Sequence, residues 1–142
     1  MSGADVDVLR RVALFSGLGA KDLKRLAQAM AERTFAAGET ITVEGEVSVG
    51  FYVIEDGRAR VEVNGRVVGT LGPGDHFGEI SLIAETPRAA TVTAETELRC
   101  YGMTSWDFRS LVERNGDIAW ELLASTAKKL YENTRSARVE DA

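Results

Sequence analysis

Short runs of alternating or β-branched residues fill the middle of the chain. Glycines separate these runs, and nine of the 14 glycines fall between Gly38 and Gly78. Short strands with glycine turns at this spacing are typical of a closed or sandwiched antiparallel sheet. The predicted strands cover residues 40–43, 51–54, 59–63, 67–71, 90–94 and 97–101.

Apolar residues recur at helical spacing at both ends of the chain. Two short helices are predicted before the first strand, with a glycine-containing break at residues 16–19. After the last strand, a helix capped by Thr104 or Ser105 precedes a longer helix that begins near Asp117. The longer helix carries an apolar stripe made of Ile118, Leu122, Leu123, Thr126, Ala127 and Leu130.

These elements predict one mainly β domain with flanking helices over residues 1–142. N-terminal helices occupy about residues 1–33, and two C-terminal helices occupy residues 105–136. Between them, residues 34–104 are predicted to form an antiparallel jelly-roll β-barrel, also called a double-stranded β-helix. A chain of 142 residues has the length of one domain with a single core.

The composition argues against several classes of protein. One histidine and one cysteine, His76 and Cys100, allow neither an intrachain disulfide nor a four-ligand His/Cys zinc site, so we expect no bound metal. A net charge of -5 argues against direct DNA binding, which needs a basic surface. The chain has no run of 18 apolar residues and no signal sequence, so we expect a cytoplasmic protein that does not bind membranes.

The segment 72–92 interrupts the predicted strands. Residues 79–84 lack strict alternation and suit one or two turns of helix. The first N–H groups of such a helix attract anions, and Gly78 lets a ligand approach the backbone. The planar guanidinium of Arg88 can bind a phosphate, whereas Glu79 needs a donor such as a sugar hydroxyl. This set of groups suits a nucleotide whose phosphate and ribose lie close together.

Simpler roles are open for the same residues. Arg88 can be a surface arginine paired with Glu85 or Glu95, and Glu79 can be a carboxylate that stabilises the start of a helix. His76 lacks the partners that a general base needs, so we expect it in a strand at the edge of the barrel. No catalytic residue is predicted.

Two runs in this segment form a pair with a known counterpart. The first is Phe-Gly-Glu-Ile-Ser-Leu at residues 77–82, and the second is Pro-Arg-Ala-Ala-Thr-Val at residues 87–92. Together they resemble the phosphate-binding cassette, here residues 77–92, of the cyclic nucleotide-binding domain family. That family includes the catabolite activator protein and the regulatory subunit of cyclic-AMP-dependent protein kinase. The similarity extends over nearly the whole chain, through residues 15–18, 37–41, 43–46 and 51–54 to the two terminal helices.

The resemblance implies a role for each residue of the cassette. Glu79 accepts a hydrogen bond from the ribose 2'-hydroxyl, Arg88 binds an exocyclic oxygen of the cyclic phosphate, and the N–H groups of Gly78 and Ala89 add contacts. Ala89 favours cyclic AMP, because relatives selective for cyclic GMP often carry threonine there. The implied ligand-binding residues are Gly78, Glu79, Ile80, Ser81, Arg88, Ala89 and Ala90, with base contacts from Tyr131, Asn133 and Thr134.

The resemblance also implies a regulatory sensor without enzymatic activity or cofactor, whose ligand is cyclic AMP or cyclic GMP and whose C-terminal helices move. Because no effector domain is recognised, the expected partners are a second copy through the last helix or an unknown effector protein. Two alternatives stay open: an orphan domain of the same fold that binds another small anion or no ligand, and a piece of a longer protein. A cupin-like enzyme would need more than one histidine.

One departure from the family pattern precedes the strand at residues 51–54. Members commonly carry Gly-Asp or Gly-Glu at this place, whereas this chain has Ser48 and Val49, followed by Gly50. The geometry of this loop is therefore not predicted by the resemblance.

Overall fold

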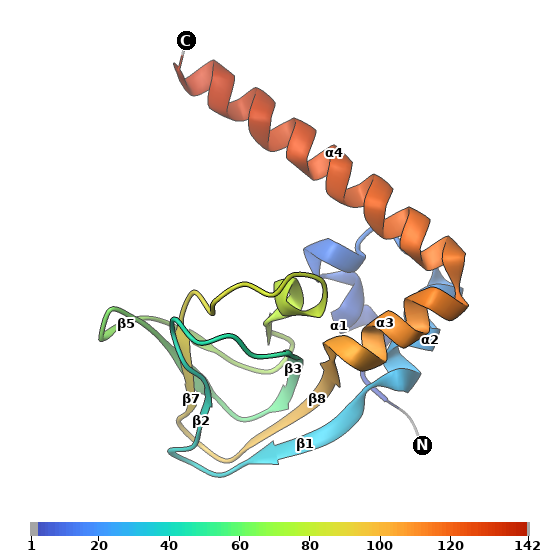
Figure 1. Ribbon diagram of the computed structural model, residues 1–142. Coiled ribbons are helices and arrows are strands. Elements are labelled where there is room, and N and C mark those ends of the chain that lie inside the picture. Colours follow the sequence, from blue (N-terminus) through green and yellow to red (C-terminus); the bar gives the residue numbers. More distant parts are fainter. Residues whose placement is uncertain (1–2, 142) are drawn as a thin grey trace.

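The computed structural model describes the backbone of residues 3–141 and the side chains of residues 3–135. It begins with α1 (Val6–Arg10), η1 (Ala13–Phe15) and α2 (Ala20–Ala29). Gly19 is the N-cap of α2, so the predicted break between the first helices is confirmed. Figure 1 shows these helices packed at one end of the β body. The outer limits predicted for the domain, residues 1 and 142, lie outside the described residues.

The β body consists of two four-stranded antiparallel sheets. One sheet has the order β1-β8-β3-β6 and the other β2-β7-β4-β5. All six predicted strands are present; residues 59–63 keep their predicted bounds, and the other five have shifted ends. The strands are β1 (Ala31–Phe35), β2 (Thr40–Thr42), β3 (Gly50–Asp56), β4 (Ala59–Val63), β5 (Arg66–Leu71), β6 (His76–Phe77), β7 (Thr91–Ala94) and β8 (Leu98–Thr104).

The mainly β class with flanking helices is confirmed, but the closed barrel is not. Within residues 3–141 no strand of one sheet pairs with a strand of the other. The jelly-roll topology therefore stays a prediction, and the observed body is a pair of separate sheets.

The first strand, β1, was not predicted. Four of its five residues are exposed, and only Phe35 is buried, so it lacks the apolar alternation of a half-buried strand. Its position comes from backbone pairing with β8, in which Ala31 lies opposite Gly102 and Phe35 opposite Leu98. The N-terminal helical region thus ends before residue 31, earlier than the predicted residue 33.

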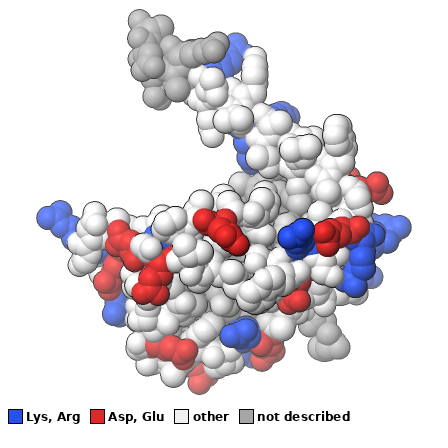
Figure 2. Space-filling model, in the orientation of Figure 1, with Lys and Arg blue, Asp and Glu red and all other residues white. Residues whose placement is uncertain are grey.

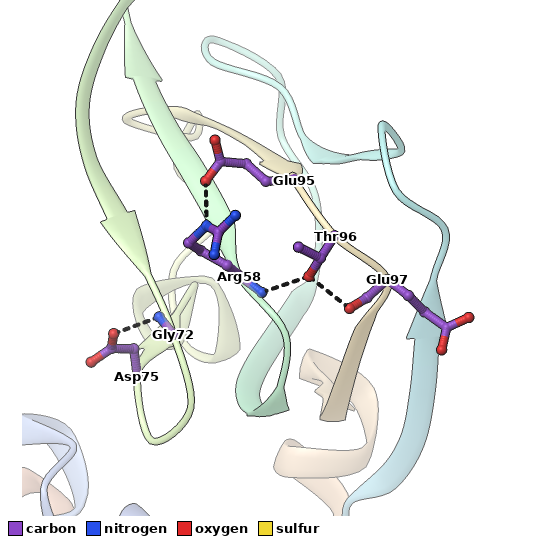
Figure 3. Close-up of polar contacts among 6 residues, drawn as sticks. All are labelled: Arg58, Gly72, Asp75, Glu95, Thr96 and Glu97. Atoms are coloured by element: carbon purple, nitrogen blue, oxygen red, sulfur yellow. Dashed lines mark hydrogen bonds and ion pairs between the residues drawn. The ribbon is translucent and has the colours of Figure 1, made fainter.

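Short polar contacts fix the turns at the end of the β body (Figure 3). Thr96 Oγ1 accepts a hydrogen bond from the Arg58 N–H at 3.0 Å, and Arg58 Nε donates to Glu95 Oε1 at 3.1 Å. In the neighbouring turn the Gly72 N–H donates to Asp75 Oδ2 at 2.8 Å. These bonds hold the connections β3–β4, β5–β6 and β7–β8.

Two apolar clusters form the core. The smaller lies within the β body and contains Phe35, Ile54, Ala59, Val92, Ala94, Leu98 and Cys100. The larger joins the helices to β3, and at its centre the rings of Phe15 and Phe51 meet edge to face with centroids 5.5 Å apart. Phe108 packs against Phe15 at 6.1 Å. The larger cluster therefore ties both terminal helical regions to the sheet that contains β3 and β8.

Two helices follow β8. Thr104 caps α3 (Ser105–Arg114), because its Oγ1 accepts a hydrogen bond from the Asp107 N–H at 3.2 Å. The last helix, α4 (Gly116–Asp141), continues beyond the predicted end at residue 136. Figure 1 shows α4 projecting away from the β body, toward the C-terminus. No helix in residues 3–141 combines the length and the apolar character that crossing a bilayer requires.

The predicted apolar stripe of α4 is buried only over its first turns. Ile118 is fully buried and Leu122 nearly so, whereas Leu123 and Leu130 are exposed. The N-terminal part of α4 is thus anchored in the larger core cluster, and the following turns expose apolar side chains to solvent.

Candidate functional site

The segment between β6 and β7 begins with a left-handed glycine. Gly78 has φ 88° and caps η2 (Glu79–Leu82), a single 3-10 turn of four residues. The predicted one or two turns of helix are therefore confirmed at the lower limit. Because a single turn has only a small dipole, binding of an anion here would depend mainly on the charge of nearby side chains and on close approach of the anion to the backbone.

A pocket of about 490 Å³ opens beside η2. Its lining includes every residue of the predicted cassette set: Gly78, Glu79, Ile80, Ser81, Arg88, Ala89 and Ala90. Apolar side chains of the β body, Val61, Leu71 and Val92, complete another part of the wall. The pocket therefore combines ionisable side chains with an apolar surface, although ligand binding by these residues stays a prediction.

Arg88 is buried in the wall of this pocket, with 8% of its surface exposed. Its Nε donates to Ser48 Oγ at 2.6 Å and its Nη2 donates to the Gly50 carbonyl at 2.6 Å. Burial lowers the pKa of its guanidinium from the ordinary value, because the charged form loses solvation. The alternative of a surface arginine paired with Glu85 or Glu95 is wrong, since Arg88 is buried and no ion pair among the described side chains joins it to either residue; Glu95 pairs with Arg58 instead.

Gly78 lies directly against the Arg88 side chain. A Cβ atom at Gly78 would overlap Arg88 Nη1 and would lie 2.5 Å from the Gly50 carbonyl oxygen. The positive φ angle also disfavours any other residue. Gly78 is therefore required both by its backbone conformation and by the path of the arginine beneath it.

Glu79 also lines the pocket and forms a hydrogen bond with His76. Its Oε2 is 3.3 Å from His76 Nε2, and both side chains are about three-quarters buried. This hydrogen bond is the main reason why the pKa of Glu79 is lowered, and it outweighs the opposing effect of burial. A lowered pKa keeps Glu79 ionised and able to accept hydrogen bonds.

His76 lies in β6 at the edge of its sheet, as predicted. Its pairing with Glu79 was not predicted from the sequence. The sequence shows that the two residues are three positions apart, but the turn that brings their side chains together depends on Gly78.

The predicted base contacts are not part of this pocket. Tyr131, Asn133 and Thr134 lie on α4, where they are exposed, and none of them lines the pocket. In Figure 2 the helix forms an arm that stands clear of the β body, with a hollow beneath it that displays few charged side chains.

A separate groove of about 610 Å³ runs between η2 and the helices α3 and α4, lined by Ile83, Trp106 and Leu123 among others.

The loop between β2 and β3 contributes contacts that the sequence did not reveal. Ser48 and Gly50 lie 40 and 38 residues before Arg88 and accept both of the hydrogen bonds from its guanidinium. The departure from the family pattern at Ser48 and Val49 pointed to this loop. It did not indicate that the loop touches the cassette, because the contact forms only when the β body folds.

Comparison with known proteins agrees with this geometry. Residues 32–115 match the family model described as the cyclic nucleotide-binding domain. That range begins in β1, ends just after α3 and includes the whole pocket beside η2.

Individual proteins show the same similarity. The chain is 38% identical over 106 residues to a cAMP-dependent protein kinase regulatory subunit from Yarrowia lipolytica, a match that covers 73% of this chain and 28% of the relative. The crystal structure of the N-terminal domain of a transcriptional regulator from Streptomyces coelicolor A3(2) has a TM-score of 0.79 at 32% identity, covering 89% of this chain and 94% of that one. The regulatory domain of Toxoplasma gondii PKA, crystallised with cAMP, has a TM-score of 0.66 at 33% identity, covering 75% and 42%. The chain thus spans little more than a quarter of the length of the curated relative.

Proposed function

The chain belongs to the cyclic nucleotide-binding domain family, and on that premise we propose that it binds cyclic AMP in preference to cyclic GMP and signals through α4. The observation that carries this proposal is the pocket beside η2, in which a buried arginine and an ionised glutamate face one space. A cyclic nucleotide matches this pair, because one ring system presents a phosphate and a ribose hydroxyl close together.

Each polar group of the pocket has a proposed partner on the ligand. Arg88 binds an exocyclic phosphate oxygen, and Glu79 accepts a hydrogen bond from the ribose 2'-hydroxyl. The N–H groups of Gly78 and Ala89 add contacts to the ribose and the phosphate. A hydrogen bond to a charged group contributes about 1.5–3 kcal/mol, so the arginine contact alone is worth more than tenfold in affinity.

The preference for cyclic AMP rests on Ala89. Its side chain is exposed at the pocket and carries no hydroxyl that could bond the guanine amino group. The Toxoplasma gondii relative was crystallised with cAMP, which supports the same choice.

Signalling is proposed to occur through α4 and a protein partner. A ligand can move this helix only if it binds more tightly when the helix lies close to the pocket. In that position Tyr131, Asn133 and Thr134 would contact the base. Trp120, Leu123 and Leu130 are more than half exposed on the same helix and offer an apolar surface to a second copy or to an effector protein.

The test is calorimetric titration with cyclic AMP, cyclic GMP and adenosine. We expect cyclic AMP to bind most tightly, and Arg88→Ala to weaken its binding more than tenfold without weakening adenosine equally. The control is Arg99→Ala, an exposed arginine of β8 outside the pocket, which should leave the affinity unchanged. Chromatography of the titrated samples should recover the nucleotide intact, as expected of a sensor without catalytic activity.

Failure of the wild-type protein to bind either cyclic nucleotide would overturn the proposal and favour the orphan domain. Selectivity has its own variant, Ala89→Thr, which should raise the affinity for cyclic GMP relative to cyclic AMP. An unchanged ratio would remove the argument from Ala89.

A further inference from the structure

The backbone of Arg88 is held by the loop that connects β2 and β3. The Arg88 N–H donates to the Glu46 carbonyl and the Gly45 N–H donates to the Arg88 carbonyl, each at 2.9 Å. This reciprocal pair fixes the backbone of Arg88 against the loop. The same loop, residues 43–49, then leads into β3 at Gly50.

The side chain of Arg88 is oriented by the same part of the chain. Nε donates to Ser48 Oγ and Nη2 donates to the Gly50 carbonyl, both at 2.6 Å, while Nη1 lies beneath Gly78 at the pocket. A guanidinium has five N–H donors in a rigid plane, so these two bonds fix its orientation and leave donors for a ligand. Without Ser48 Oγ, the plane could turn about the bond to Gly50.

Both acceptors are neutral. Among the side chains of residues 3–135, no carboxylate forms an ion pair with Arg88, and Val49, next to Ser48, has no polar group. The hydroxyl and the carbonyl satisfy two N–H groups without neutralising the buried charge. A buried charge of this kind gains most from an anionic partner.

We propose that Ser48 is a positioning residue for phosphate binding, which holds the Arg88 guanidinium in the plane that meets the phosphate. This inference rests on the proposed function, since it concerns how that site presents its arginine. Ser48 does not line the pocket and acts only through Arg88.

The first experiment is a double-mutant cycle on the affinity for cyclic AMP. Ser48→Ala should weaken binding about tenfold, because a bond to a charged group is lost, and Ser48→Thr should restore most of the affinity. In the Arg88→Ala background, Ser48→Ala should have no further effect. The control is Thr96→Ala, which removes a hydroxyl that accepts a hydrogen bond from the Arg58 N–H outside the pocket and should leave affinity unchanged.

The second experiment needs no ligand. In ¹⁵N–¹H spectra of the free protein, the Arg88 Nε–H signal should exchange slowly with water in the wild-type protein and in Ser48→Thr, and quickly in Ser48→Ala. Equally slow exchange in Ser48→Ala would overturn the inference, even if no cyclic nucleotide binds.

The two proposals fail in different ways. Wild-type affinity in Ser48→Ala, or an equal loss in both backgrounds of the cycle, would overturn the role of Ser48 and leave cyclic nucleotide binding intact. Absence of binding by the wild-type protein would overturn the proposed function, and with it the part of the inference that concerns phosphate.

Discussion

The carboxylate of Glu79 and the imidazole of His76 lie 3.3 Å apart across the turn made by Gly78. The first residue is the proposed ribose acceptor, and the second belongs to the edge strand β6. The pKa of Glu79 is lowered mainly by this hydrogen bond. The protonation state of this proposed ligand-binding group therefore depends on a residue of the β body.

Replacement of His76 by alanine should raise the pKa of Glu79 toward its ordinary value. Because the pKa of Glu79 is lower in the folded protein than in the unfolded chain, its ionised carboxylate stabilises the fold at pH values above the ordinary glutamate pKa. This stabilisation is lost as the pH falls through the lowered pKa. The free energy of unfolding of His76→Ala should thus be about 0.5–1 kcal/mol lower than wild type at pH 6, with a smaller gap near pH 3.5. NMR titration of the Glu79 carboxyl carbon and urea unfolding measure both effects. An unchanged Glu79 titration in His76→Ala would contradict this prediction, whereas Arg99→Ala should leave that titration unchanged.

Gly78→Ala should abolish tight binding, and Gly38→Ala should not. Both glycines have φ 88°, so each substitution should lower the free energy of unfolding by about 1–2 kcal/mol through backbone strain. Only at Gly78 does the new Cβ atom also displace Arg88, whereas at Gly38 it meets no atom within 4 Å. Urea unfolding and calorimetry separate the two effects. Equal affinities in the two variants would show that the close approach of Gly78 to Arg88 has no role.

The thiol of Cys100 should be inert in the folded protein. Burial raises its pKa to about 12, so the thiolate is scarce at pH 8. A thiol reagent such as DTNB should modify Cys100 only in denaturant, while an introduced cysteine at exposed Ser110 should react at once. Because the folded state disfavours the thiolate, this residue lowers stability as pH rises above the ordinary thiol pKa. Rapid reaction of the native protein would contradict the prediction.

Lys129 should restrict the orientation of α4. Its Nζ donates to Ser16 Oγ at 3.0 Å and to Ser125 Oγ at 3.1 Å, which joins the middle of α4 to the segment after η1. Lys129→Ala should therefore broaden the distance distribution between spin labels at Asn133→Cys and Glu95→Cys. The exposed neighbour Lys128 provides the control, since Lys128→Ala should leave the distribution unchanged.

The same pair of labels tests the proposed signal. Cyclic AMP should shorten the distance if the helix approaches the pocket, and Arg88→Ala should suppress that change. Identical distributions with and without cyclic AMP, under conditions where calorimetry detects binding, would exclude movement of α4.

The strand pattern was predictable where side chains alternate and glycines mark the turns. For β3 and β4 the runs of apolar or β-branched residues and the flanking glycines are local properties, which a sequence records directly. The strand β1 has no such pattern, because it is held by backbone bonds to β8, almost 70 residues away in the chain. Backbone pairing of this kind leaves little trace in the side chains of an exposed strand.

The cassette was predictable for a similar reason. Gly78, Glu79 and Arg88 occur within 11 consecutive residues, and only the single turn η2 and the short irregular segment after it separate them. The structure placed all seven cassette residues around one pocket. The base contacts on α4 come only from the resemblance to the family, and a match of residues along a helix does not determine where that helix points.

The sequence by itself determined the secondary-structure class and the chemical groups of this protein: a mainly β chain, one thiol, and an arginine and a glutamate close to a glycine turn. Only the tertiary structure decided how those groups are presented. It set Arg88 against Ser48 and Gly50, paired Glu79 with His76, and directed α4 away from the pocket. The physical reason is that residue type and local spacing are written along the chain, whereas burial, hydrogen-bond partners and helix direction arise when distant segments pack together.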